Sequence, residues 1–241
     1  MRTLQAAVAV SVALLATGAA AQPDPYWLAC RGQDLAQRIS ACTIVIRAGS
    51  DTPANLAIAH SNRAYAYEEQ GDLRRAIEDY SEAIRLNPRY AEAYDSRGYV
   101  YEKQDQYERA LGDYNQAAAI EPGNATYWNS RCWVKSLANR PREALADCEQ
   151  ALRLDPDHSA AHDSRALARF MTGDLTGART DYDIRLRTET NAAWSYYGRA
   201  MVREAAGDRT GAAEDFAAAR NAADPAEFAR IERQIGKFRR K

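Results

Sequence analysis

The sequence has little of what catalysis usually needs. Its 241 residues include three histidines and four cysteines, and no Cys-x-x-Cys motif that would suggest thiol redox chemistry. It also contains no Gly-rich phosphate loop, no nucleophile elbow and no paired-carboxylate motif. We therefore expect a protein that is not an enzyme, with no catalytic residue, no metal site and no cofactor.

An excess of either charge is absent as well. Lysine and arginine together number 32 against 33 acidic residues, which gives a formal net charge of −1. Nucleic-acid binding requires a basic excess, so this balance argues against a nucleic acid as the main partner. Beyond the N-terminus no apolar run approaches the length of about 20 residues that spans a bilayer, and we expect no transmembrane segment in the mature chain.

The N-terminus has the features of an export signal. Arg2 precedes an uncharged, mostly apolar run over residues 6–21, which ends in three alanines before the first acidic residue, Asp24. A basic start, a short apolar stretch and an A-x-A exit are typical of a secretory signal peptide. The alternative, an N-terminal membrane anchor, is weakened by the polar residues that interrupt this run. We expect residues 1–21 to be removed after Ala21 and the mature protein to be periplasmic or secreted.

Two series of residues recur every 34 positions. One is a tripeptide with a central arginine, which begins at Asn62, Ser96, Ser130, Ser164 and Gly198. The other is a single alanine, at Ala76, Ala110, Ala144, Ala178 and Ala212. A fixed period of this length indicates one helical unit repeated along a solenoid, so the predicted fold is all-α.

Within each unit the pattern resembles the tetratricopeptide repeat family. The second unit carries its small, aromatic and proline positions at Tyr94, Gly98, Tyr101, Ala110, Tyr114, Ala117 and Pro122. The resemblance implies an α-α superhelix of five helix pairs, residues 57–226, divided as 57–90, 91–124, 125–158, 159–192 and 193–226. We expect residues 22–56 to form an N-terminal capping hairpin and residues 227–241 a C-terminal capping helix with a basic tail.

Each first helix carries an arginine that is followed sixteen residues later by an aspartate. The pairs are Arg63 with Asp79, Arg97 with Asp113, Arg131 with Asp147, Arg165 with Asp181 and Arg199 with Asp215. We interpret them as structural ion pairs between the two helices of a unit. The alternative is a basic track for an anionic ligand, which would not need an acid in every unit.

Four cysteines in an exported chain permit disulfides in three possible pairings. Cys132 and Cys148 lie on the two helices of the third unit, and Cys30 and Cys42 lie in a shorter version of the same hairpin. We predict the disulfides Cys30–Cys42 and Cys132–Cys148. The alternative is four buried thiols that pack as small apolar side chains.

In the tetratricopeptide repeat family the first helices line the concave face, and the resemblance implies a partner-binding groove there. Its residues would be Asn62, Tyr65, Tyr99, Asn129, Trp133, Leu167, Phe170, Trp194, Tyr197 and Met201, with Glu92, Asp95 and Asp163 beside them. The later half of this groove is apolar. It could hold a helix or extended peptide from a partner, or the chain's own C-terminal helix through Phe228, Ile231 and Phe238.

The resemblance thus implies an exported scaffold or adaptor that binds a protein or peptide partner of the cell envelope through its concave face. One alternative is an envelope structural component that self-associates by end-to-end stacking of its repeats. A more remote alternative is a metal-dependent enzyme, because His158 and His162 stand four residues apart among aspartates. Two imidazoles without a further strong ligand are a weak metal signal.

Overall fold

The computed structural model describes residues 24–239. The predicted signal peptide lies outside the described residues. Within them the regular elements are all helical, which confirms the predicted all-α fold. The helices are α1 (Pro25–Cys30), α2 (Leu35–Ala48), α3 (Pro53–Glu69), α4 (Leu73–Leu86), α5 (Ala91–Lys103), α6 (Tyr107–Ile120), α7 (Ala125–Leu137), α8 (Pro141–Leu154), α9 (Ser159–Thr172), α10 (Leu175–Thr188), α11 (Ala193–Ala205), α12 (Arg209–Ala222) and α13 (Pro225–Gln234), with a final 3-10 turn η1 (Gly236–Phe238).

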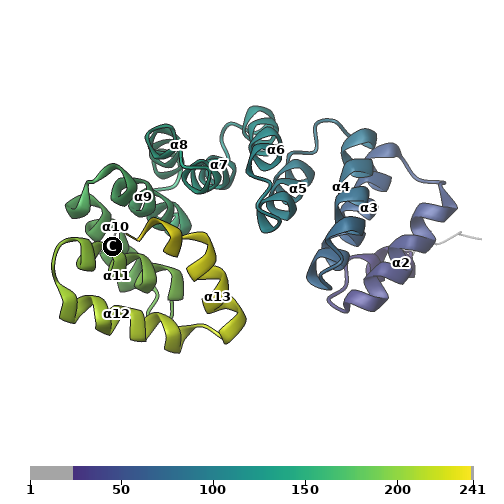
Figure 1. Ribbon diagram of the computed structural model, residues 1–241. Helices are drawn as coiled ribbons and strands as arrows, with labels where there is room; N and C mark the ends of the chain where they lie inside the picture. Colours follow the sequence, from purple (N-terminus) through teal and green to yellow (C-terminus); the bar gives the residue numbers. More distant parts are fainter. Residues whose placement is uncertain (1–23, 240–241) are drawn as a thin grey trace, which may run out of the picture.

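Consecutive helices pack as pairs, and the pairs stand side by side in one curved row. Figure 1 shows the row as an arch that runs from α2 and α3 to α11 and α12. The last helix, α13, does not extend the row. It turns back and lies on the inner side of the arch, beside α11.

The turn inside each pair needs a residue with a left-handed backbone, and its position repeats every 34 residues. Glycine fills it at Gly71, Gly173 and Gly207, with φ of 79°, 94° and 87°. Asp105 and Asn139 fill it in the two middle pairs, with φ of 57° and 61°. Short polar side chains tolerate this conformation better than others do, which explains why these two turns form without glycine.

Small side chains let the two helices of a pair approach closely. Four of the recurring alanines are fully buried, and the fifth, Ala212, is nearly so. Gly98 on α5 faces the ring of Tyr114 on α6, and a Cβ added there would lie 2.9 Å from the ring carbon Cε1. The aromatic ring therefore occupies the space that a larger residue at position 98 would need.

Every arginine of the charge ladder binds its aspartate with two nitrogens. Nε and Nη2 donate to the two carboxylate oxygens at 2.5–2.9 Å in all five pairs. In four of them the third nitrogen, Nη1, reaches the preceding pair of helices. Its acceptors are Thr43, Ser81, Asn115 and Asp183. Each of these four guanidinium groups therefore holds together two helices of one pair and also two neighbouring pairs.

The four cysteines form two disulfides, each inside one helix pair. Cys30–Cys42 joins α1 to α2 with a Cα–Cα distance of 4.7 Å, and Cys132–Cys148 joins α7 to α8 at 5.4 Å. No free cysteine remains among residues 24–239. These are the pairings expected from the hairpin positions.

Candidate functional site on the concave face

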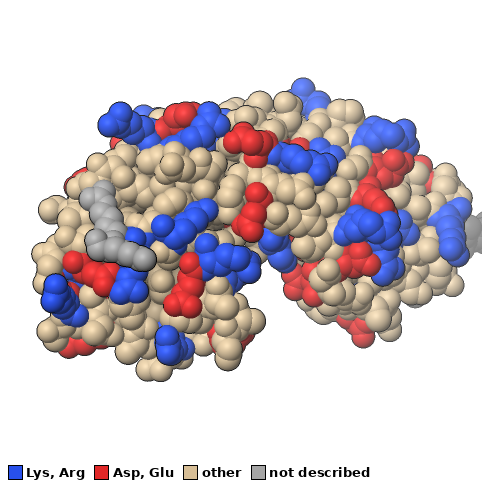
Figure 2. Space-filling model, viewed as in Figure 1, with Lys and Arg blue, Asp and Glu red and all other residues tan. Residues whose placement is uncertain are grey.

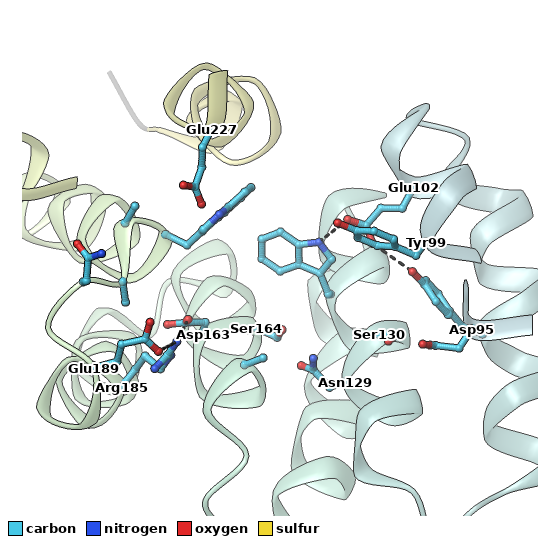
Figure 3. Close-up of a pocket in the computed structure, with 17 residues that line it drawn as sticks. Asp95, Tyr99, Glu102, Asn129, Ser130, Asp163, Ser164, Arg185, Glu189 and Glu227 are labelled. Atoms are coloured by element: carbon cyan, nitrogen blue, oxygen red, sulfur yellow. Dashed lines mark hydrogen bonds and ion pairs between the residues drawn. The ribbon is translucent and has the colours of Figure 1, made fainter. Parts of the chain in front are cut away.

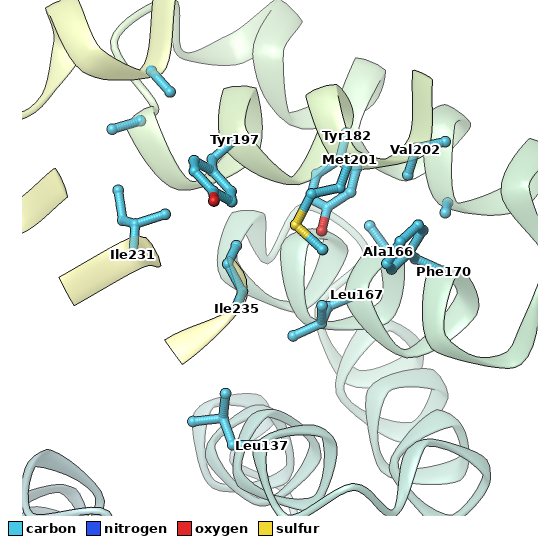
Figure 4. Packing of buried hydrophobic residues seen from close by; sticks show 13 residues of the cluster. Leu137, Ala166, Leu167, Phe170, Tyr182, Tyr197, Met201, Val202, Ile231 and Ile235 are labelled. Atoms are coloured by element: carbon cyan, nitrogen blue, oxygen red, sulfur yellow. The ribbon is translucent and has the colours of Figure 1, made fainter. Parts of the chain in front are cut away.

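The C-terminal helix covers the apolar half of the concave face. Ile231 and Ile235 are buried against the first helices of the last two pairs (Figure 4), and Phe228 and Phe238 pack around them. The four groove residues beneath are at most 3 % exposed: Leu167, Phe170, Tyr197 and Met201. In this structure the chain's own helix covers them, so they do not line an open groove, and burying this apolar area inside the chain is strongly favourable.

Polar contacts hold the end of the chain in this position. The Lys237 ammonium donates to the main-chain oxygen of Leu137 at 3.2 Å. The Arg239 guanidinium binds both carboxylate oxygens of Glu204 at 2.5 and 2.6 Å. Of the two occupants considered for the apolar half, the structure contains the chain's own helix.

The remaining part of the groove is a pocket of about 420 Å³ between α5, α7, α9, the start of α11 and α13. Figure 3 shows Asp95 and Asp163 on opposite sides of it with Asn129 between them, while Glu227 points toward it from α13. The two aspartates and the asparagine occupy the same position in three successive repeats, 34 residues apart. The solenoid therefore lines up Asp95, Asn129 and Asp163 along the floor of one pocket.

Aromatic side chains form the walls of the pocket. Tyr99, Trp133 and Trp194 all line it, and the two indole rings meet edge to face at a centroid distance of 5.5 Å. The pocket thus gathers four of the predicted groove residues. Two others, Asn62 and Tyr65, lie one repeat earlier and outside the pocket. Tyr65 is exposed with the Arg38 guanidinium 5.0 Å from its ring centre.

Burial raises the pKa values of three carboxyl groups in the pocket. The pKa of Asp95 rises to about 6, that of Asp163 to about 6 and that of Glu102 to about 7, in each case mainly by desolvation. Hydrogen bonds from Trp133 Nε1 at 2.9 Å and from the Tyr114 hydroxyl at 3.2 Å partly offset this for Glu102.

Two oxygen atoms in the pocket lack a partner. Oδ1 of Asp95 and Oδ1 of Asn129 are both buried, and neither accepts a hydrogen bond. Asp163 has partners, because it accepts a hydrogen bond from the Ser195 hydroxyl at 2.7 Å and lies 3.4 Å from Arg185 Nε. A buried acceptor without a donor is unfavourable, so the unpartnered oxygens mark a place where a ligand can supply donors.

Three residues that line the pocket, Glu102, Arg185 and Glu227, are not among the predicted groove residues. Glu102 has a counterpart 34 residues earlier, Glu68, which likewise accepts from a tyrosine hydroxyl and also forms an ion pair with Lys103 at 3.4 Å. A glutamate recurring at a first-helix position was the signal that could have identified it. Arg185 and Glu227 reach the pocket only through the packing of α10 and α13.

The two histidines proposed as remote metal ligands have structural partners. His158 caps α9, where its Nδ1 accepts from the Ala161 amide at 3.3 Å. The ring of His162 lies between Asp181, at 3.5 Å, and the main-chain oxygen of Pro156, at 3.0 Å. Across residues 24–239 no group of three or more ligating side chains is placed to hold a metal ion.

Figure 2 shows acidic and basic side chains interspersed on the face that it displays, without a large patch of one sign. Among the described helices, none combines the length and the apolar character that a membrane span requires.

Models of one family match three stretches of the chain. A TPR repeat model matches residues 64–105, and two tetratricopeptide repeat models match residues 91–124 and 138–193. No curated protein sequence matches the chain.

Solved structures with a similar fold include a tetratricopeptide repeat protein from Parabacteroides merdae, with a TM-score of 0.69 and 19% identity over 85% of this chain and 79% of that one. The pilus biogenesis factor PilW gives a TM-score of 0.64 and 21% identity, over 76% of this chain and 86% of its own. YrrB, a TPR protein with an unusual peptide-binding site, gives 0.57 and 20% identity, over 82% of this chain and 100% of its own. At sequence identities of about 20%, these structures are similar to this chain in fold alone.

Proposed function

Because this chain is a tetratricopeptide repeat protein, we propose that it is an exported scaffold that binds a segment of a cell-envelope protein in the pocket on its concave face. The observation that carries the proposal is the pocket itself. It is open, it has aromatic walls, and its floor holds buried oxygens that lack hydrogen-bond donors. Aromatic side chains combined with a few polar groups are typical of binding sites.

Two further observations support the cellular setting. Two disulfides within a chain of this size are typical of proteins that fold in an oxidising compartment. The N-terminal residues 1–21 read as a secretory signal peptide. Among the proteins of similar fold, one is a pilus biogenesis factor and another has a peptide-binding site, which is the class of function proposed here.

A crosslinking pull-down from cells of the source organism tests the proposal. Tyr99→Ala removes an exposed ring from the pocket, and Tyr26→Ala removes a somewhat more exposed ring from α1, far along the chain. We expect the wild type and Tyr26→Ala to recover the same partner, and Tyr99→Ala to recover little of it. Equal recovery by both variants would show that the partner does not use the pocket.

A further inference from the structure

The carboxylates of this chain fall into two groups with different surroundings. Each aspartate of the charge ladder is bound by two nitrogens of an arginine, as Asp113 is by Arg97 at 2.8 Å. Asp95 and Glu102 in the pocket form no ion pair within residues 24–239, although Glu102 is buried and so is the Oδ1 atom of the half-buried Asp95. Arg230 is close enough to lower the pKa of Glu102, but desolvation outweighs its effect.

Buried carboxylates without a cation oppose folding, because the charged form loses hydration and gains no partner. A chain that compensates five other aspartates with arginine could have compensated these two. Titratable groups with strongly perturbed pKa values gather at functional sites. The two acids therefore indicate a ligand that provides the missing charge.

The lining of the pocket determines the sign of that charge. Five carboxylic acids line it against one guanidinium: Asp95, Glu102, Asp163, Glu189 and Glu227 against Arg185. The two unpartnered oxygens, on Asp95 and Asn129, can only accept hydrogen bonds. Arg185 pairs with Asp163 and Glu189, which leaves an excess of acids in the lining. A ligand that matches this lining is positively charged and donates hydrogen bonds, and a concave wall with an excess of one sign concentrates the field that attracts it.

The apolar walls determine the rest of the ligand. The Tyr99 ring already has the Lys103 ammonium 5.2 Å from its centre, and the Trp194 ring has the Arg230 guanidinium 5.4 Å from its centre. A bound cation would therefore lie at the carboxylates rather than over these rings. Trp133 is left to cover an apolar stem, and long basic side chains combine such a stem with a charged end.

We propose that the pocket binds a lysine or arginine side chain carried by an extended segment of the partner protein. The charged end lies between Asp95 and Asn129, and the methylene stem lies along Trp133. A pocket of about 420 Å³ belongs to the lower part of the range for small-ligand sites, about 300–1,000 Å³. The inference rests on the proposed function, since it specifies which residue of the partner the concave face recognises.

Peptides of fixed sequence test this inference with the full mature chain. The probes are acetylated and amidated peptides of the form Gly-Ala-Tyr-X-Tyr-Ala-Gly, where X is lysine, arginine, norleucine or glutamate. Norleucine matches the lysine stem without its charge. Calorimetric titration at pH 7.5 should show the lysine and arginine peptides binding about tenfold tighter than the norleucine peptide, because one charge-assisted hydrogen bond is worth at least this much.

Two variants locate the effect. Asp95→Asn keeps the size of the side chain and removes a charge that no cation balances, so it should fold normally and lose most of the preference for lysine. Asp157→Asn makes the same change at an exposed position outside the pocket and should keep it. Thermal unfolding of both variants separates lost recognition from lost structure.

The outcomes separate the inference from the proposed function. Equal binding of the lysine and norleucine peptides, or preference for glutamate, overturns the inference and leaves the concave face as the binding surface. Binding of n-butylammonium as tightly as the lysine peptide also overturns it, in favour of a free amine ligand. If no peptide binds, the inference fails, and the pull-down with Tyr99→Ala decides the proposed function independently.

Discussion

Replacing Arg97 by methionine should destabilise the fold by about 3 kcal/mol. Methionine keeps an apolar stem of similar length and removes three donors, two to Asp113 at 2.8 Å and one to Ser81 at 2.9 Å. Breaking one side of a buried ion pair costs about 3–5 kcal/mol because the other charge remains buried alone. The Arg97 and Asp113 side chains are 18% and 9% exposed, so the lower end of this range applies.

Urea unfolding followed by circular dichroism measures this loss, and the melting temperature should fall by about 6–12 °C for a chain of this length. The matched control is Arg74→Met. Arg74 also binds a carboxylate, that of Glu78, but the two side chains are 76% and 59% exposed. An exposed pair of this kind contributes about 0–1 kcal/mol, so the control should unfold almost like the wild type.

A double variant tests the physical reason. Asp113→Asn removes the charge that Arg97→Met leaves unpaired, so the double variant should recover at least about 1 kcal/mol relative to the single one. The reasoning is refuted if Arg97→Met unfolds within about 0.5 kcal/mol of Arg74→Met, which is the usual scatter of surface substitutions. If that variant is also unable to recover the partner, the arginines form a binding track instead.

Three further predictions concern other parts of the chain. Replacing Cys132 and Cys148 together by alanine should lower the free energy of unfolding by about 3 kcal/mol in urea, because it opens a cross-link with a sequence separation of 16. Gly98→Ala should destabilise the fold by about 1–3 kcal/mol by overpacking against Tyr114. Gly112→Ala in α6, where nothing lies near the added Cβ, should stabilise it by about 0.5–1 kcal/mol. Urea unfolding of both variants checks that the two changes in the free energy of unfolding have opposite signs. Glu102→Gln should make the protein more stable than the wild type at pH 8 by about 1–3 kcal/mol, and this difference should shrink toward pH 5. Burial raises the pKa of Glu102 from 4.5 to about 7. The protonated carboxyl therefore favours folding fully below about pH 4.5, and this contribution is lost as the pH rises through 7. A stability difference between the variant and the wild type that grows toward pH 5 would contradict the prediction.

The repeating features could be predicted from the sequence, whereas the position of the single C-terminal helix could not. The 34-residue period gives the helix pairs, and the arginine and aspartate series follow from the same spacing. The position of α13 depends on a competition between the chain's own apolar residues and an outside partner for one surface. An amphipathic helix from a partner could cover the same apolar residues as α13 does, so the sequence does not decide between the two occupants.

Turns and the pocket show the same limit at smaller scale. The glycine at position 71 indicates a turn in the sequence, but Asp105 adopts the same left-handed backbone conformation without a glycine. Tyr99 and Trp133 share a repeat position, and only the resemblance to the tetratricopeptide repeat family assigned that position to the concave face. Glu227 reaches the pocket from a helix outside the repeats, and no periodicity predicts that contact.

The arginines that reach back to the preceding pair affect how the molecule comes apart. Arg131 donates to Asp147 in its own pair and to Asn115 in the one before, so the loss of either neighbour leaves polar groups of the other without partners. Unfolding that starts at one end of the row should then spread across successive pairs instead of stopping at the first boundary. Hydrogen exchange would report this as a similar protection of the middle helices, and fragments cut between pairs should be much less stable than their share of the chain suggests.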